Sequence, residues 1–491
     1  MGPTPARGTP AGPEAAMADD AETPECYDLA VIGGGVVGHG IAWVARLSGR
    51  SVALIDDAPG SGASWAAAGM LAPVSELHYQ EEALLELMLE SSRLWPAFAA
   101  GLDGGADGGA DGGAGRAGTD AGTGYLTTPT LAVGADAADR RALADLRAVQ
   151  QAHGLAVEPL TVREARLREP LLSPGISCAF DIPADHQVDP RRLLARIGGL
   201  LAADSRCRII SRRAAGLLWA DGRVTGASLA GGGTVRAKET IVANGLGAAA
   251  LEGLPPGLRL PLRPVHGDIL RLRVPEKLRP LLTSTVRGLV RGVPVYLVPR
   301  QDGTVVIGAT QREDDLGADS QTEATDRGNP DSGNPSGGAA GGNPSGGAVS
   351  AGGVYQLLRD AQQLVPAVAE LELLEATARA RPGTPDNAPL LGRVADPQHG
   401  VVAGLIIATG FFRHGILLTP AAAEICRQLL DGVADPRWAH FRPDRFATGT
   451  PGTGPQAAGP PVTGPPETAP RTTTHRNTTP EHSKETVCAS D

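Results

Sequence analysis

Cysteine is scarce in this chain, and its spacing excludes several kinds of site. The five cysteines (Cys26, Cys178, Cys207, Cys426 and Cys488) are scattered, odd in number and form no CxxC pair. This pattern argues against a disulfide framework, a zinc site and a dithiol redox pair, and it is typical of a reducing cytoplasm. The ten histidines show no metal-ligand spacing in the folded part. We therefore expect no metal site and a cytoplasmic protein.

Long apolar runs and blocks of basic charge are also missing. The most apolar region, Leu29 to Leu47, is interrupted by glycines, His39 and Arg46, so no membrane span of roughly twenty residues survives. Residues 1–25 have no apolar core, which argues against a secretory signal, and Met17 offers an alternative start. The formal net charge is −10 with acid and base intermixed, so nucleic acid is not an expected partner.

Four segments have too little apolar surface to fold. They are predicted to be a disordered N-terminus, two flexible surface insertions and a disordered tail. Their residues are 1–25, 103–123, 319–353 and 447–491. The remaining body of about 360 residues is long enough for two domains.

The clearest motif is a glycine-rich turn between a strand and a helix. Tyr27 to Ile32 is short, β-branched and apolar, as buried parallel strands are. The spacing Gly33-x-Gly35-x-x-Gly38 then opens a helix predicted over Val36 to Leu47. The first glycine permits a tight turn, the second lets a pyrophosphate approach the backbone, and the third lets helix and strand pack closely.

The residues after this helix complete a dinucleotide-binding pattern. A second strand is predicted over Ser51 to Ile55, and it ends at Asp56. A carboxylate about 20 residues past the glycines suits the ribose hydroxyls of an unphosphorylated adenosine half. Strand, glycines, helix, strand and acid all occur in order, so the sequence predicts a dinucleotide site.

The rest of the chain alternates between helical and strand-like segments. Asp189 is the expected N-cap of one helix, and Gly245 follows a strand that ends at the dinucleotide site. Helices are expected over 81–102, 137–153, 161–169, 190–203 and 419–430. Strands are expected over 124–133, 208–217, 223–229, 234–235, 239–243, 293–299, 304–307 and 404–409.

Six ordered motifs together resemble the flavoproteins of the D-amino-acid-oxidase type, and most closely their glycine oxidase branch, which serves thiamine biosynthesis. They are VIGGGVVG (31–38), GASWAAAGMLAP (62–73), VYLVPR (295–300), VIGAT (306–310), RPGTPDNAPLLG (381–392) and ATGFFRHGILLTP (408–420). The resemblance covers the chain from Tyr27 to about Phe446, apart from the insertions.

The resemblance implies an α/β fold, α+β overall, with a discontinuous Rossmann-like FAD-binding domain and a second, antiparallel-sheet substrate domain. The FAD-binding domain is expected over 26–102, 178–262 and 376–446, and the substrate domain over 124–177 and 263–375. FAD is expected to bind without a covalent link. The implied cofactor-binding residues are Gly33, Gly35, Val36, Val37, Gly38, Asp56, Asp57, Ala63, Ser64, Ala68, Gly69, Met70, Gly245, Phe411, Phe412, Arg413, His414, Gly415, Ile416 and Leu417.

The same resemblance implies that Arg381, Arg413 and Tyr296 bind the substrate. A planar guanidinium such as that of Arg381 matches an amino-acid carboxylate. Arg413 stands between apolar residues and His414, where we expect a buried anion as its partner. The sequence departs from the family pattern at Gln311 and around His266-Gly267-Asp268, which leaves the preferred substrate open.

The implied reaction moves a hydride from glycine, or another small amine, to the flavin, and no protein residue acts as a catalytic base. Dioxygen then reoxidises the flavin and releases hydrogen peroxide, and the imine hydrolyses to glyoxylate or passes to thiazole synthesis. A sarcosine or D-amino-acid oxidase or dehydrogenase is the nearest alternative. A flavin-dependent tRNA modifier, a nicotinamide dehydrogenase and a non-catalytic scaffold are less favoured, and a homo-oligomer is compatible with the sequence.

Overall fold

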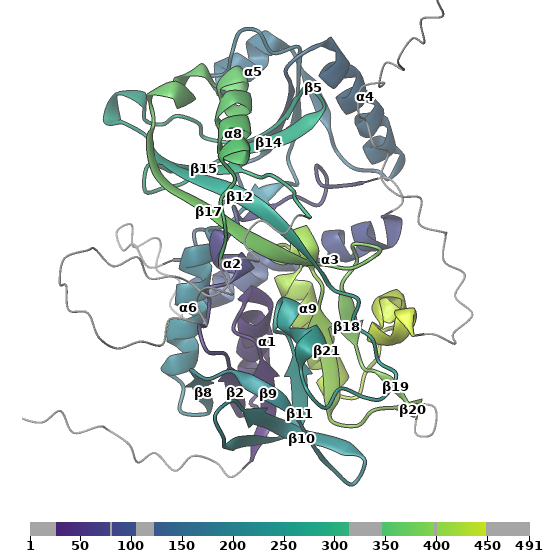
Figure 1. Cartoon of the computed structure of the whole chain (residues 1–491). Coiled ribbons are helices and arrows are strands. Elements are labelled where there is room, and N and C mark those ends of the chain that lie inside the picture. Colours follow the sequence, from purple (N-terminus) through teal and green to yellow (C-terminus); the bar gives the residue numbers. More distant parts are fainter. Residues whose placement is uncertain (1–25, 79–80, 105–121, 314–345, 397–399, 448–491) are drawn as a thin grey trace, which may run out of the picture. The chain divides into compact units, whose positions relative to one another are not determined.

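The structure, a computed structural model of the chain, describes residues 26–78, 81–104, 122–313, 346–396 and 400–447. It contains two large sheets (Figure 1). The fold is mixed α/β, with a Rossmann-like parallel sheet and a largely antiparallel second sheet, as predicted. The predicted disordered N-terminus, most of both insertions and all but the first residue of the tail lie outside the described residues.

The first sheet is built around five parallel strands, of which β1, β2 and β21 are almost entirely apolar. Its main order is β18-β21-β11-β1-β2-β8, with β10 and β9 continuing from β11 in antiparallel fashion. Strands with hydrophobic residues on both faces must be covered on both faces. The bounds are β1 Tyr27–Ile32, β2 Val52–Ile55, β8 Cys207–Ile210, β9 Ala214–Ala220, β10 Arg223–Leu229, β11 Thr234–Val242, β18 Leu390–Gly392 and β21 Leu405–Thr409.

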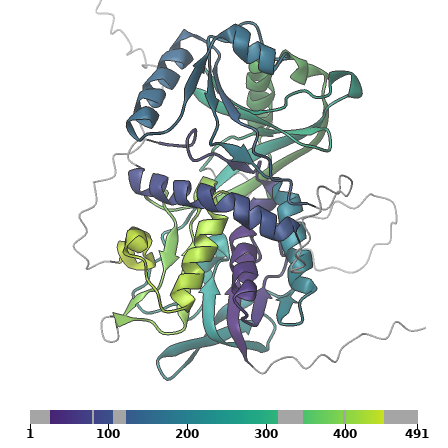
Figure 2. The same ribbon diagram turned by 180° about the vertical axis from the view of Figure 1, so that it is seen from behind.

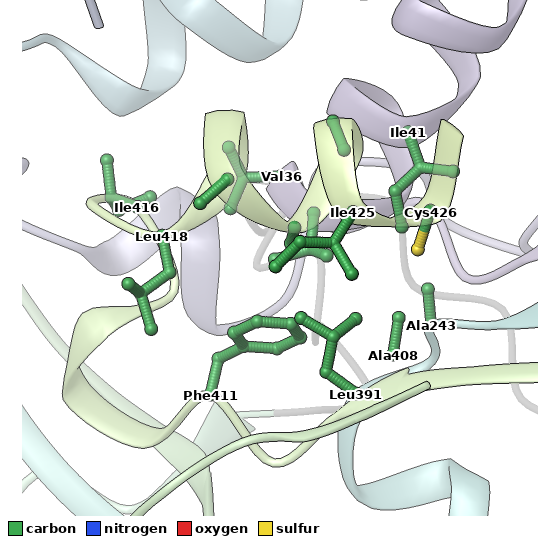
Figure 3. Close-up of a cluster of buried hydrophobic side chains, with 14 of the residues drawn as sticks. Val36, Ile41, Ala243, Leu391, Ala408, Phe411, Ile416, Leu418, Ile425 and Cys426 are labelled. Carbon is green, nitrogen blue, oxygen red and sulfur yellow. The ribbon is translucent and has the colours of Figure 1, made fainter. Parts of the chain in front are cut away.

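The helices α1, α6 and α9 cover one face of this sheet, and α3 packs against α9; Figure 2 shows α1, α3 and α9 from that side. Their bounds are α1 Val36–Leu47, α3 Glu82–Asp103, α6 Pro190–Ala202 and α9 Thr419–Leu430. Their apolar side chains form one continuous core with the strands. Figure 3 shows part of it, where Phe411 and Leu391 pack against Ile425 of α9. Segments almost four hundred residues apart in the sequence therefore share a core.

The second sheet has nine strands in the order β16-β17-β12-β15-β14-β13-β4-β6-β5. Helix α8 (Ala351–Leu364) packs on it and closes its own core (Figure 1). The bounds are β4 Thr130–Gly134, β5 Glu158–Leu160, β6 Cys178–Ile182, β12 Arg263–Arg273, β13 Thr285–Val290, β14 Val293–Pro299, β15 Thr304–Gly308, β16 Gly346–Gly347 and β17 Glu372–Gly383.

The smaller elements link these layers. They are α2 Ala63–Ala66, β3 Met70–Leu71, α4 Ala137–Ala152, α5 Val162–Arg168, β7 His186–Gln187, β19 Ala395–Asp396 and β20 Gly400–Val401. Short 3₁₀ turns occupy Gly245–Ala250 (η1), Glu276–Leu278 (η2), Pro366–Glu370 (η3), Phe412–His414 (η4), Pro436–Phe441 (η5) and Pro443–Phe446 (η6).

Strand β17 runs antiparallel to β12 over its whole length, with one irregularity. Glu375 pairs with Arg271 and Leu373 with Leu272, so Leu374 is an extra residue, a β-bulge. Beyond the bulge the register is regular, and it places Arg381 opposite Val265.

The helices of the structure agree closely with the sequence predictions. Helices α1 and α9 begin and end at the expected residues. The Asp189 side chain caps α6 by accepting hydrogen bonds from the backbone N–H groups of Arg191 and Arg192. Periodic helices with clear start signals were thus readable from the sequence.

Two strand predictions were wrong. The single strand expected over 208–217 is two strands, β8 and β9, because the chain leaves the parallel sheet after Ile210 and joins the antiparallel extension. The two strands expected over 234–235 and 239–243 are one, β11. Exposed Arg236 and Lys238 suggested a break, but they alternate with buried neighbours along one strand.

Sheet membership also differs from the expected division of the chain. β6 and most of β17 fall in segments expected to belong to the FAD-binding domain, yet both pair in the nine-stranded sheet. Pairing depends on distant partners, β4 and β12, which the strand's own sequence does not reveal. The insertion expected to end at 353 is structured at its end, since 346–347 form β16 and Ser350 caps α8.

Candidate functional site

The glycine turn after β1 is held by close backbone contacts. Gly33 has φ +114, and a Cβ there would lie 2.5 Å from the carbonyl carbon of Ala243. A Cβ on Gly38 would collide with the carbonyl oxygen of Gly33. Gly38 therefore lets α1 pack against the turn rather than lining a cavity, which is the packing role that the motif predicts for it.

A cavity of about 490 Å³ opens at this turn, beside the carboxyl ends of β1, β2, β11 and β21. In parallel sheets ligands bind at this edge. The cavity brings together most of the predicted cofactor-binding residues, namely Gly33, Gly35, Val36, Val37, Asp56, Asp57, Ala63, Ser64, Gly245, Phe411, Phe412, Arg413, Gly415 and Ile416.

Asp56 joins the glycine turn to the residues that follow β2. Its carboxylate accepts hydrogen bonds from the backbone N–H groups of Gly34 (2.6 Å) and Ala58 (2.8 Å). Two carboxylate oxygens offer about four acceptor positions, so capacity remains for ribose hydroxyls. The Ser64 hydroxyl accepts a hydrogen bond from the Val36 N–H at the start of α1 (3.1 Å).

The far wall of the cavity is the loop between β21 and α9. Gly410 has φ +74, and Phe412 has φ +46, a left-handed conformation that is rare for an aromatic residue. Strained backbone of this kind concentrates at ligand sites. The carbonyl of Leu417 accepts hydrogen bonds from Ser91 Oγ (2.6 Å) and Trp95 Nε1 (2.8 Å) of α3, which fix the loop from behind.

A second, smaller cavity of about 160 Å³ adjoins the first. The two share Ala67, Ile269, Arg381, Phe412, Arg413 and Ile416 as lining residues. The remaining predicted residues line the smaller cavity, namely Ala68, Gly69, Met70, Tyr296, His414 and Leu417. The residues predicted to bind the cofactor are therefore divided between two adjoining cavities, apart from Gly38, which lines neither.

Arg381 stands on the wall between the two cavities. Its guanidinium lies over Gly267 of β12, where a Cβ would come within 2.5 Å of Arg381 Cζ. Its Nη1 donates a long hydrogen bond to the carbonyl oxygen of Thr310, at 3.4 Å. Among the described residues no carboxylate pairs with Arg381, so its charge is available to an anionic ligand.

Arg413 differs from Arg381 because it forms ion pairs with carboxylates of the protein itself. Its Nη2 lies 2.6 Å from Glu81 Oε2, and its Nε lies 3.3 Å from Glu76 Oε2. The buried anion expected beside Arg413 is thus a pair of glutamates. Glu76 also pairs with Arg287 of β13.

The titratable groups of the smaller cavity keep their ordinary charge states at neutral pH. Burial acts to raise the pKa of Glu76, but the guanidiniums of Arg287 and Arg413 hold it below its usual range. Burial raises the pKa of Tyr296, so its hydroxyl stays protonated. Burial, together with the charge of Arg413, holds the pKa of His414 well below its usual value, so its ring is neutral.

Sequence reasoning missed Glu76, Glu81, Arg287 and the role of Gly267. Arg287 carried a signal, since it is a lone charge within the apolar strand Thr285–Val290. Gly267 stood out only as an unusual neighbour of His266. Glu76 and Glu81 lie in a polar connecting segment, where nothing in the local pattern separates them from solvated acids.

Comparisons with known proteins agree with this geometry. Residues 28–429 match the family described as "DAO: FAD dependent oxidoreductase". The chain belongs to this DAO family. FAD is therefore its cofactor, and the protein is an FAD-dependent oxidoreductase.

Several members of the family are similar over most of this chain. The glycine oxidase of Geobacillus kaustophilus is 31% identical over 412 residues, 82% of this chain and 93% of that protein. Its crystal structure has a TM-score of 0.68 at 29% identity and covers 85% of this chain and 98% of that one. The bifunctional protein ThiO/ThiG of Trichormus variabilis is 29% identical over 85% of this chain, and the chain spans only 55% of that protein's length.

The residues of this DAO-family chain fit FAD in three ways. The larger cavity is lined both by the N-terminus of α1 and by residues of the Phe411–Ile416 loop. Backbone N–H groups and the dipole at the start of α1 suit a pyrophosphate. Asp56 retains acceptor capacity for a ribose. Within the described residues no cluster of His, Cys, Asp and Glu suits a metal ion, and no helix is long and apolar enough to cross a membrane.

Proposed function

We propose that this DAO-family protein is a glycine oxidase. It oxidises glycine, and other small amines, to the imine, with hydrogen peroxide as the second product. The observation that carries the proposal is Arg381, a cation with no carboxylate partner among the described residues, on the wall shared by the cofactor cavity and the smaller cavity. The relatives named glycine oxidase support the choice of substrate.

The proposal gives each side of the site a task. Arg381 binds the amino-acid carboxylate, and the Tyr296 hydroxyl, protonated and facing the same cavity, assists it. The apolar side chains of Ile269 and Ile416, shared by both cavities, exclude water from the reacting carbon. When bound, without a covalent link, FAD accepts a hydride from the substrate's α-carbon, and dioxygen is the final electron acceptor.

The proposed cofactor contacts are those placed on the larger cavity. The turn residues Gly33, Gly35, Val36 and Val37 meet the pyrophosphate, and Asp56 meets the ribose. The 411–416 loop meets the flavin ring. The imine either hydrolyses to glyoxylate or passes to thiazole synthesis, a link supported by the ThiO/ThiG relatives.

A panel of amines tests the proposal directly. The purified holoprotein is mixed anaerobically with glycine, sarcosine or D-alanine, and bleaching of the flavin absorbance is followed. Peroxide formation is then measured in air. We expect glycine to bleach the flavin and to yield peroxide. A protein that is bleached only by sarcosine or D-alanine, or that is bleached without forming peroxide, is instead the related oxidase or a dehydrogenase.

A further inference from the structure

The smaller cavity contains a compact network of opposite charges beside Arg381. Arg287 pairs with one oxygen of Glu76, and Arg413 Nε lies 3.3 Å from the other. Arg413 Nη2 also pairs with Glu81 at 2.6 Å. Two arginines are thus matched by two glutamates.

This network is shielded from water. The side chains of Arg287, Arg413, Glu76 and Glu81 are between 11% and 17% exposed. A charge shielded to this degree is costly unless it is paired and hydrogen-bonded. Glu81 is further fixed by the side-chain amide of Asn387 at 3.3 Å. The four groups therefore hold one another in place and have little charge left to offer a ligand.

Arg381 is the exception, because three guanidiniums face only two carboxylates. The site thus has one uncompensated positive charge, and it lies where the two cavities meet. A ligand with one carboxylate restores neutrality. The second carboxylate of a ligand with two would meet no unpaired guanidinium in the smaller cavity, because Arg287 and Arg413 are already paired.

We infer that Glu76 and Glu81 are specificity-determining residues that restrict the site to amino acids with a single carboxylate. They do so by occupying Arg287 and Arg413, so that only Arg381 receives an anion. The inference rests on the proposed function and narrows its substrate class. Glycine and sarcosine satisfy it, whereas iminodiacetate and D-aspartate do not.

The test compares two non-reacting ligands of equal size, malonate and its monoamide, malonamate. They differ by one carboxylate, so their relative affinity reports charge and not volume. Both are titrated into the FAD-loaded protein, and binding is followed by the change in flavin absorbance and, independently, by the melting temperature. We expect malonamate to bind about tenfold or more tightly than malonate, because the second carboxylate of malonate would lack a charged hydrogen-bond partner. The factor corresponds to the free energy of about one charged hydrogen bond.

Removing one glutamate charge is expected to abolish this preference. Glu81→Gln frees Arg413 from its nearest anion, and malonate should gain about tenfold or more relative to malonamate. Glu76→Gln, which faces both Arg287 and Arg413, is the second variant and should act in the same direction. The matched control is Glu239→Gln, because Glu239 pairs with Arg393 at 3.0 Å and lines neither cavity. It should leave the ratio unchanged.

The outcomes separate the inference from the proposed function. Equal binding of the two ligands to the unaltered protein overturns the inference, as does an unchanged ratio in a folded, FAD-loaded Glu81→Gln protein. If Glu81→Gln does not retain FAD, the ratio of the two affinities in the unaltered protein and in Glu76→Gln tests the inference. If glycine does not bleach the flavin but malonamate still binds more tightly than malonate, the proposed glycine oxidation is wrong and the inference about Glu76 and Glu81 stands.

Discussion

Arg381 and Arg413 both line the smaller cavity, but their surroundings differ. Arg413 is paired with Glu76 and Glu81, whereas Arg381 lies over Gly267 with a weak contact to the Thr310 carbonyl. A guanidinium offers a fork of N–H donors suited to a carboxylate, and its attraction is strongest where water is excluded. At the residue scale, we therefore expect ligand binding to depend on Arg381.

Replacing Arg381 by alanine should raise the KM for glycine by about ten- to hundredfold, the cost of losing a charged hydrogen-bond pair. The FAD content should be unchanged, because Asp56 and the glycine turn are intact. Steady-state peroxide assays and flavin absorbance measure the two quantities. Arg379→Ala is the comparison, since Arg379 also lines the larger cavity but lies near the Trp65 ring and does not line the smaller one. A larger KM effect from Arg379→Ala would reassign the carboxylate to that residue.

Asp185 gives a prediction about pH. It is fully buried, and burial raises its pKa to about 6, although the backbone N–H groups of Val74 and Ser75 hydrogen-bond to it. Because the folded pKa lies above the unfolded value, the folded state binds the proton more tightly. This contribution to stability is complete below about pH 4 and is lost as the pH rises through about 6.

The matching experiment compares the unaltered protein with Asp185→Asn, which cannot titrate. The difference in unfolding free energy between them should change by about 2 kcal/mol between pH 4 and pH 7, in favour of the unaltered protein at the lower pH. Urea unfolding at several pH values measures it. A difference independent of pH would mean that Asp185 does not titrate in this range.

At the scale of elements, the contact between β1 and α1 depends on Gly38. Any side chain there would meet the carbonyl oxygen of Gly33. The turn between β1 and α1 lines the larger cavity, and it cannot widen unless β1 or α1 moves. Packing and cofactor binding are therefore coupled at this one position.

Gly38→Ala should destabilise the protein by about 1–3 kcal/mol through overpacking and should weaken FAD retention. Gly199→Ala is the control, because Gly199 lies on the exposed side of α6 and a Cβ there meets nothing within 4 Å. That change should be neutral or slightly stabilising. Thermal unfolding and FAD content after gel filtration report both effects. Normal FAD content in Gly38→Ala would contradict the coupling.

The sequence predicted local elements well and their partners less well. Helices α1 and α9 followed from apolar periodicity and start signals, which depend on neighbouring residues alone. The assignment of β17 to the second sheet depends on β12, more than a hundred residues earlier in the sequence. For the same reason Arg381 was found through its motif, whereas its neighbours Glu76 and Arg287 were not, since only the fold brings them together.

At the scale of the whole molecule, FAD contacts reach from Gly33 to Ile416 on the proposed assignment. A ligand bound only by the folded state stabilises it by mass action. Protein stripped of FAD should therefore unfold more readily, and FAD added at a hundred times its dissociation constant should restore about 2.7 kcal/mol. Denaturant titration with and without FAD measures this. The same stability in both would show that these segments do not meet at the cofactor.

The bulge at Leu374 lies seven residues before Arg381 on β17. Beyond it, Glu375, Thr377, Arg379 and Arg381 share one face, and Ala376, Ala378 and Ala380 share the other. Leu373 and Glu375 already pair with the adjacent residues Leu272 and Arg271, so deleting Leu374 would restore a regular ladder and keep both faces. A change of length at the start of β17 is therefore absorbed at the bulge, and Arg381 keeps its place opposite Val265.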